Sequence, residues 1–149
     1  MMPAKGMRDS INRLEEEISH APQVECPVRH IFAHGLYARE MSMSAGTVLT
    51  GAVHKTEHIN MLLKGRITVL TDQGIKELTA PYTFISRPGI KRVGYVHEDC
   101  VWMTLHKTPT TDVRALVSEL TESKYEDLLG GENNRQLAYN AKESTWLSA

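Results

Sequence analysis

The chain has 149 residues, of which 41% are hydrophobic and 23% charged, and its formal net charge is −1. These values are typical of one globular domain with a sizeable core, and the missing basic excess argues against a DNA or RNA polymer as partner. No stretch approaches the ~18 apolar residues of a membrane span, and residues 1–20 lack the apolar centre of a secretion signal. Cys26 and Cys100 form no CxxC pair, so both are expected to be reduced in a cytoplasmic protein.

The N-terminal segment is predicted to be helical. Within residues 8–19, Ile11, Leu14 and Ile18 recur at helical spacing, and the sequence "APQ" follows. Proline and the residue before it disfavour helix, so the helix is expected to end there.

From residue 25 to residue 108 the pattern changes to short apolar or alternating runs separated by glycine, proline and polar turns. About eight strands at this spacing are typical of an all-β sandwich or barrel. "DQG" at residues 72–74 predicts a hairpin, because glycine tolerates a positive φ. "KG" at residues 64–65 and "HED" at residues 97–99 are interpreted as two further turns.

The C-terminal segment, residues 109–149, is predicted to be helical again. A helix is expected from about residue 111 to the "GG" at residues 130–131, because Val113, Leu116 and Leu120 share one face. The residues beyond the glycines have weak periodicity and are interpreted as a loosely attached helix or a partner-dependent arm.

A motif around Gly65 resembles the first motif of the cupin superfamily, which is written G, five residues, HxH, three or four residues, E, six residues, G. Gly65 matches the last glycine, and His54 falls on the second histidine. The chain departs from the motif at two positions, with His58 in place of the glutamate and Ala52 in place of the first histidine.

The second cupin motif, PxG, two residues, H, is matched in part. Pro88 and Gly89 stand in "RPGIKR", but Arg92 lies near the place of the last histidine. The resemblance covers about residues 27–107 and extends to small cupin-type proteins of unassigned function from bacteria and bacteriophages. It implies a cupin jelly-roll barrel over residues 25–108, between a helical arm at 1–24 and the helical segment at 109–149.

Two kinds of site follow from the residues at these motifs. The first is a metal site for Fe, Mn, Ni or Zn, formed by His54 and His58 with Glu57 or His97 as a further ligand. Arg92 argues against a metal, because a guanidinium stays protonated and cannot coordinate a cation.

The second is a pocket of donors for a phosphate or carboxylate, similar in general idea to the metal-independent cupins of the sugar-nucleotide epimerase branch. Its predicted residues are His54, His58, Asn60, Lys91 and Arg92. Asn60 and His58 share one face of a strand, which makes that face the natural pocket lining.

A third hypothesis rests on "HKT", which occurs at residues 54–56 and 106–108. Paired HxT motifs resemble those of the two-histidine phosphoesterases, in which the histidines act as acid and base and the threonines bind phosphate. His30 and His34 are interpreted as ordinary polar strand positions.

The sequence leaves open whether the protein is an enzyme or a non-catalytic binding module. A homodimer is expected, because apolar helices outside the barrel need a cover. For a viral protein, the expected location is the host cytoplasm.

Overall fold

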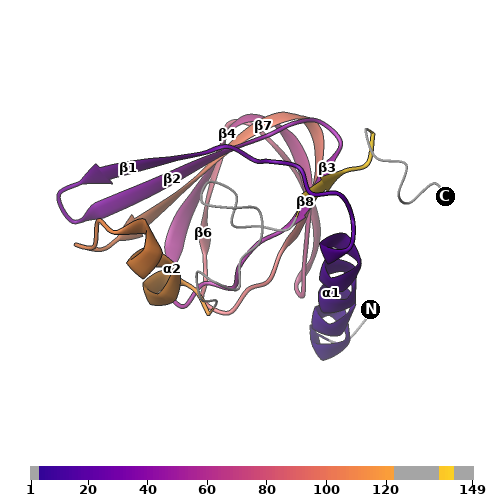
Figure 1. Ribbon diagram of the computed structural model, residues 1–149, viewed down its shortest axis with the longest axis horizontal. Coiled ribbons are helices and arrows are strands. Elements are labelled where there is room, and N and C mark those ends of the chain that lie inside the picture. The colour runs from indigo at the N-terminus through magenta and orange to yellow at the C-terminus, as the bar shows by residue number, and fades with distance from the viewer. Residues whose placement is uncertain (1–3, 123–137, 143–149) are drawn as a thin grey trace.

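The computed structural model describes residues 4–122 and 138–142, which form a curled antiparallel sheet with two helices beside it (Figure 1). The elements, in chain order, are α1 (Ala4–Ser19), β1 (Val28–Ala33), β2 (Leu36–Met43), β3 (Thr47–Thr50), β4 (His58–Thr71), β5 (Gly74–Thr79), β6 (Tyr82–Ser86), β7 (Val93–Lys107), α2 (Val113–Leu120) and β8 (Ala138–Asn140).

The two longest strands, β4 and β7, pair with each other and hold the rest of the sheet together. One end of β7 pairs with β2 and the other with β3, while β4 pairs with β6 near its start and with β5 near its end. All strand pairings among the described residues are antiparallel. This architecture confirms the predicted all-β jelly roll with flanking helices.

Both predicted turns inside the long strands are bulges rather than chain reversals. Around Gly65 the register of β4 against β7 shifts, yet β4 continues through it, and "HED" lies within β7. Gly65 has φ +89°, and a Cβ there would lie 2.3 Å from the carbonyl oxygen of Asp99. The glycine therefore allows the two strands to approach each other where both deviate from regular pairing.

The hairpin predicted at "DQG" is present. Thr71 pairs with Gly74, so Asp72 and Gln73 form a two-residue loop between β4 and β5, and Gly74 has φ +121°. This turn could be predicted from the sequence, because its conformation depends only on neighbouring residues.

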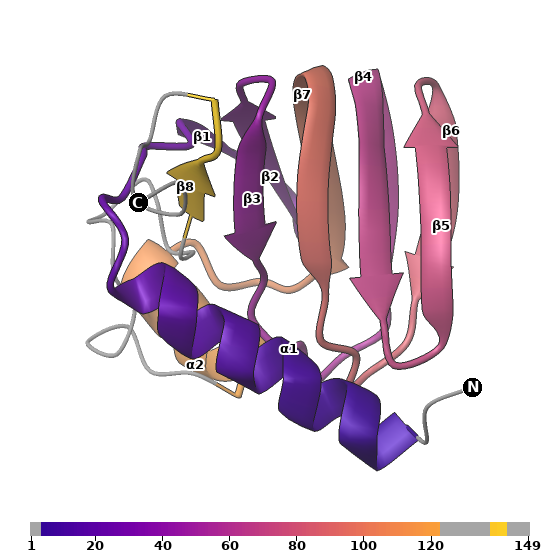
Figure 2. The ribbon, with the colours of Figure 1, turned by 90° about the vertical axis from the view of Figure 1, so that its right-hand side faces the viewer.

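Helix α1 begins at Ala4, four residues before the predicted start, and lies across one end of the sheet (Figure 2). Ile11 and Ile18 are 1% and 0% exposed, as their helical spacing predicts. On the same helix Glu15 accepts hydrogen bonds from Thr50 at 2.5 Å and from Lys91 at 2.6 Å. Apolar contact and a charged network therefore both hold α1 to the sheet.

The C-terminal segment departs from the prediction in two ways. Helix α2 ends at Leu120, because Thr121 adopts an extended conformation and pairs in a β-bridge with His54. Ala138–Asn140 is a strand and not a helix, since all three residues are buried and their backbone pairs with β3. The predicted helical residues 123–130 lie outside the described residues.

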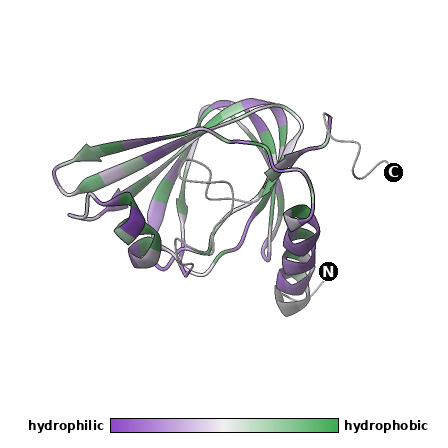
Figure 3. Cartoon of the chain, in the orientation of Figure 1, coloured by the Kyte–Doolittle hydropathy of each residue, from purple (hydrophilic) through white to green (hydrophobic). Residues whose placement is uncertain are grey.

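Along the strands, hydrophilic and hydrophobic residues alternate (Figure 3), and the inward positions form the core. Cys26 and Cys100 belong to this core as free thiols, and burial raises the pKa of each to about 11. Neither helix of the described chain is long and apolar enough to span a membrane.

Candidate functional site

A cavity of about 140 Å³ lies between the inner face of the sheet and helix α2, which is beneath β1 and β2 in Figure 1. Most of its lining is apolar and comes from the sheet core and from α2. The titratable or aromatic side chains that face it are His30, Tyr37, Arg39, His54, His58, Arg92, Trp102 and His106.

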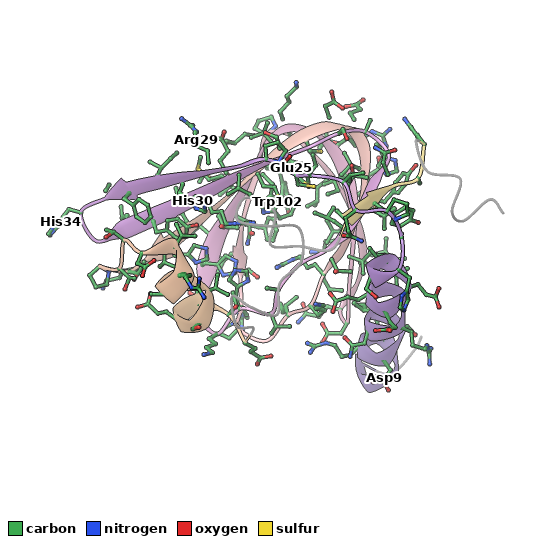
Figure 4. The ribbon with its side chains drawn as sticks, viewed as in Figure 1. Asp9, Glu25, Arg29, His30, His34 and Trp102 are labelled. Atoms are coloured by element: carbon green, nitrogen blue, oxygen red, sulfur yellow. The ribbon has the colours of Figure 1, made fainter. Side chains whose placement is uncertain are left out.

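Strand periodicity explains why polar groups from distant parts of the chain meet in this cavity. Tyr37 and Arg39 are alternate residues of β2, and Tyr37 stands opposite His106 of β7. His58 and Asn60 are alternate residues of β4 in the same way. On β1, His30 and Arg29 project to opposite sides of the strand (Figure 4).

Three histidines from separate segments form a cluster in the cavity. The ring centroids of His54 and His58 are 4.3 Å apart, those of His58 and His106 are 4.7 Å apart, and those of His54 and His106 are 5.4 Å apart. His58 and His106 are 4% and 3% exposed. The cluster is extended by Tyr37, which stacks on both His106 and His30 at 5.8 Å.

These histidines are neutral at physiological pH. Burial lowers the pKa of His54 to about 2 and that of His106 to about 3, and neighbouring histidines and Arg39 contribute further. The pKa of His58 is lowered by burial, an effect that the carbonyl of Thr56 opposes in part. A neutral imidazole offers one donor and one acceptor, so the cluster can bind either kind of group.

The positive charge of the cavity comes from Arg39 and Arg92. Arg92 donates to the hydroxyl of Ser86 at 2.5 Å, and its guanidinium lies 5.5 Å from the centroid of the Phe84 ring. Burial lowers the pKa of Arg92, but a guanidinium remains protonated in proteins. The described residues that line the cavity include no Asp or Glu.

Of the predicted site residues, the structure brings His54, His58, Asn60 and Arg92 together around the cavity. Lys91 does not join them. Its neighbour Arg92 lines the cavity, whereas the ammonium group of Lys91 bonds Glu15 of α1. Lys91 therefore helps to attach α1 and does not line the cavity.

Two predicted metal ligands are also absent from the cavity lining. Glu57 is exposed, because it precedes β4 and has the opposite parity from His58. His97 lies in β7 and not in a turn, where its Nε2 is 2.6 Å from the hydroxyl of Thr68. The predicted set of two histidines and one carboxylate is therefore not assembled.

Sequence reasoning missed several residues of the site. Arg39 belongs to no motif, His106 is marked only by its HKT motif, and His30 resembles an ordinary polar strand residue, yet all three line the cavity. Alternation in "LYAREM" places Tyr37 and Arg39 on one face. That signal could have grouped them, but only strand pairing shows that their face is the inner one.

The two HKT motifs bring their histidines together but not their threonines. His54 and His106 stack, whereas Thr56 is exposed and the hydroxyl of Thr108 donates to Glu119 of α2 at 2.6 Å. Neither threonine lines the cavity. The arrangement that a two-histidine phosphoesterase uses to hold phosphate is therefore not formed.

The part of the chain that the structure describes assembles no metal site around the histidine cluster. Within residues 4–122 and 138–142, no group of three or more His, Cys, Asp or Glu side chains could hold a metal. Two arginines would also oppose a divalent cation.

No family model and no curated protein sequence matches the chain. Among solved structures, the chain is similar to an RmlC-like cupin from Shewanella frigidimarina, with 18% identity over 63% of this chain and 88% of the other and a TM-score of 0.47. It is also similar to KdgF from Halomonas sp., with 18% identity over 62% and 89% of the two chains and a TM-score of 0.47. For EutQ from Clostridium difficile the identity is 12% over 56% and 68%, and the TM-score is 0.46.

Fold and site together define an all-β jelly-roll protein with a histidine- and arginine-lined cavity. At these identities and TM-scores, the similarity to solved structures carries no information on ligand or reaction. The chemistry of the cavity has to be argued from its own side chains.

Proposed function

We propose that the protein binds a small anionic molecule, bearing a carboxylate or a phosphate, in the cavity between α2 and the inner face of the sheet. The observation that carries this proposal is the charge of the lining. Arg39 and Arg92 face a cavity whose histidines are neutral and whose described lining contains no carboxylate.

Taking a cation out of water is costly, so an anionic ligand beside the partly buried Arg92 would offset part of that cost. Hydrogen bonds between a guanidinium and a carboxylate or phosphate are roughly twice as strong as neutral ones, especially where water is excluded. Because most of the lining is apolar, the ligand is expected to carry an apolar body beside its charged group.

The proposed activity is capture and not turnover. A metal-assisted reaction would require ligands that the described cavity does not assemble, and the acid–base hypothesis built on the HKT motifs lacks its phosphate-binding threonines. A binding protein returns its ligand intact after denaturation, whereas an enzyme releases a changed molecule.

The test is calorimetric titration of the full chain, after dialysis against a metal chelator, with inorganic phosphate and with 4-methylpentanoate as probes. Arg92→Gln and His54→Ala are each expected to weaken binding of the preferred anion more than tenfold. Arg87→Gln is the matched control, because Arg87 lies nearby but is exposed, and its affinity should stay within twofold of wild type. Circular dichroism verifies that each variant is folded.

Unchanged affinity in both cavity variants would contradict the proposed site. Affinity that is lost on chelation and restored by Fe, Mn, Ni or Zn would instead support a metal-dependent cupin.

A further inference from the structure

Two buried polar side chains on β4 face the cavity with one hydrogen-bonding atom each unused. They are His58 and Asn60, which are 4% and 1% exposed. The His58 Nε2 and the Asn60 Nδ2 are buried and have no hydrogen-bond partner among the described residues. Unsatisfied buried groups are uncommon in folded proteins, so each indicates a partner that a ligand would supply.

The role of the free atom of His58 is fixed by its other nitrogen. Nδ1 lies 3.1 Å from the carbonyl oxygen of Thr56. A carbonyl can only accept, so Nδ1 carries the proton of the neutral ring, and Nε2 presents a lone pair to the cavity. The His58 Nε2 is therefore an acceptor that requires a donor from the ligand.

The unused group of Asn60 is a hydrogen-bond donor, whereas that of His58 is an acceptor. The indole of Trp102 can only donate, and its Nε1 lies 3.0 Å from the Asn60 Oδ1. The amide oxygen is thus occupied, and the amide nitrogen is the unused group. The Asn60 Nδ2 is therefore a donor that requires an acceptor from the ligand.

The register of the sheet places a cation beside this pair. His58 and Asn60 lie two residues apart on one face of β4, about 6.6 Å along the strand. Ser86 stands opposite His58 on β6 and accepts a hydrogen bond from Arg92. One side of the cavity thus contains an acceptor, a donor and a guanidinium, within a lining that is mostly apolar.

From this juxtaposition we infer that the ligand is a hydroxycarboxylate with an apolar body. Its hydroxyl donates to the His58 Nε2, and its carboxylate accepts from the Asn60 Nδ2 and from Arg92. The inference rests on the proposed function and narrows it. A simple carboxylate would leave His58 unsatisfied, and a fully ionised phosphate would direct oxygen lone pairs at the lone pair of His58.

The test compares two probes that differ by one hydroxyl, 2-hydroxy-4-methylpentanoate and 4-methylpentanoate, in titrations of the full chain. The wild type is expected to bind the hydroxy acid at least tenfold more tightly. In His58→Leu, which removes the acceptor, this advantage should fall below twofold. Asn60→Asp retains an oxygen for Trp102 but replaces the donor, so both carboxylates should bind more than tenfold more weakly.

Equal wild-type affinity for the two probes, or an advantage that persists in His58→Leu, would overturn the inference. Should His58→Leu fail to fold, the wild-type comparison and Asn60→Asp decide. Inorganic phosphate is the third probe. Binding of phosphate but of neither carboxylate overturns the hydroxycarboxylate inference and leaves the anion proposal standing, whereas failure of all three probes to bind overturns both.

Discussion

His54 and His106 are neutral because they are buried, and because His58 and Arg39 lie close to both of them. If either ring took up another proton, the resulting positive charge would be shielded from water and repelled by the nearby arginines. The cluster therefore acts as a set of uncharged hydrogen-bonding groups, and the arginines alone supply the charge. This separation of roles is what makes the cavity selective for anions in our proposal.

The same histidines make the stability of the fold pH-dependent. Their pKa values are about 2 and 3 in the folded protein and near 6.5 in the unfolded chain, so below pH 6.5 the unfolded state binds more protons. The contribution of these two histidines to the free energy of unfolding is complete above pH 6.5, and it is lost as the pH falls toward 3. Each histidine contributes up to about 1.4 kcal/mol per pH unit in that window. Urea unfolding between pH 7.5 and 4.5 measures this slope.

Single variants assign the slope to the cluster. His106→Gln and His54→Gln should each make the free energy of unfolding less dependent on pH, because one titrating group is removed. His34→Gln is the control, since His34 is exposed at the tip of the β1–β2 hairpin (Figure 4). A wild-type stability that stays constant from pH 7 to 5 would contradict the lowered pKa values.

At the scale of the elements, the approach of β4 and β7 at the bulge depends on Gly65. A methyl group there would clash with backbone atoms of Asp99, which cannot move aside as a flexible side chain can. We expect Gly65→Ala to lower the free energy of unfolding by about 3 kcal/mol, from the positive φ and the clash together. Chemical denaturation measures the loss.

Gly74→Ala separates the two causes. Gly74 also has a positive φ, but nothing lies within 4 Å of its added Cβ, so only the conformational cost of about 1 kcal/mol applies. Equal losses for the two variants would mean that the close approach at Gly65 contributes nothing.

The sequence predicted the helices and turns whose conformation depends on residues close together in the chain. The apolar spacing of Ile11 and Ile18 gave the helix, and "DQG" gave the hairpin. The bulge at Gly65 was misread as a turn, because a positive φ is required by both. Ala138–Asn140 could not be recognised as a strand, since its pairing partner β3 lies about ninety residues earlier in the chain.

The candidate site was predictable only along one strand. Alternation grouped His58 and Asn60 correctly, since that relation depends on neighbours in sequence. Arg39 and His106 join them through the pairing of β2 with β7, which the sequence does not specify. Lys91 and Arg92 are neighbours in sequence but point to different places, Lys91 toward Glu15 of α1 and Arg92 toward the cavity.

At the scale of the whole molecule, the outer face of the sheet carries an apolar row across five strands. Successive register pairs align Ile31, Ala38, Leu105, Ile59 and Ile85. In each strand the row residue is adjacent to a residue whose side chain points to the inner face. Because successive side chains alternate, the row points away from the cavity. Ala38 is only 7% exposed, whereas Ile59 and Ile85 are 39% and 64% exposed. The accessible part of the row is therefore on β4 and β6, and exposed apolar patches of this kind mark interaction surfaces.

A second copy of the chain fits this row better than a partner of one charge. Arg29 and Glu40, which form an ion pair with each other at 3.0 Å, flank the row on one side, and Lys107 flanks it on the other. A two-fold axis along the row would bring Glu40 of one copy toward Lys107 of the other while covering the isoleucines of both. Such an interface would be self-complementary in apolar character, and Glu40 would gain a second cation beside Arg29.

We therefore expect a homodimer that a charge within the row disrupts. Light scattering at tens of micromolar should give the mass of two chains for the wild type and of one chain for Ile85→Glu. Ile75→Glu is the matched control, because Ile75 is 69% exposed but lies on β5, outside the row, and that variant should stay dimeric. A monomeric wild type would remove the interface. Dissociation of both variants would mean that added charge, and not its position in the row, separates the copies.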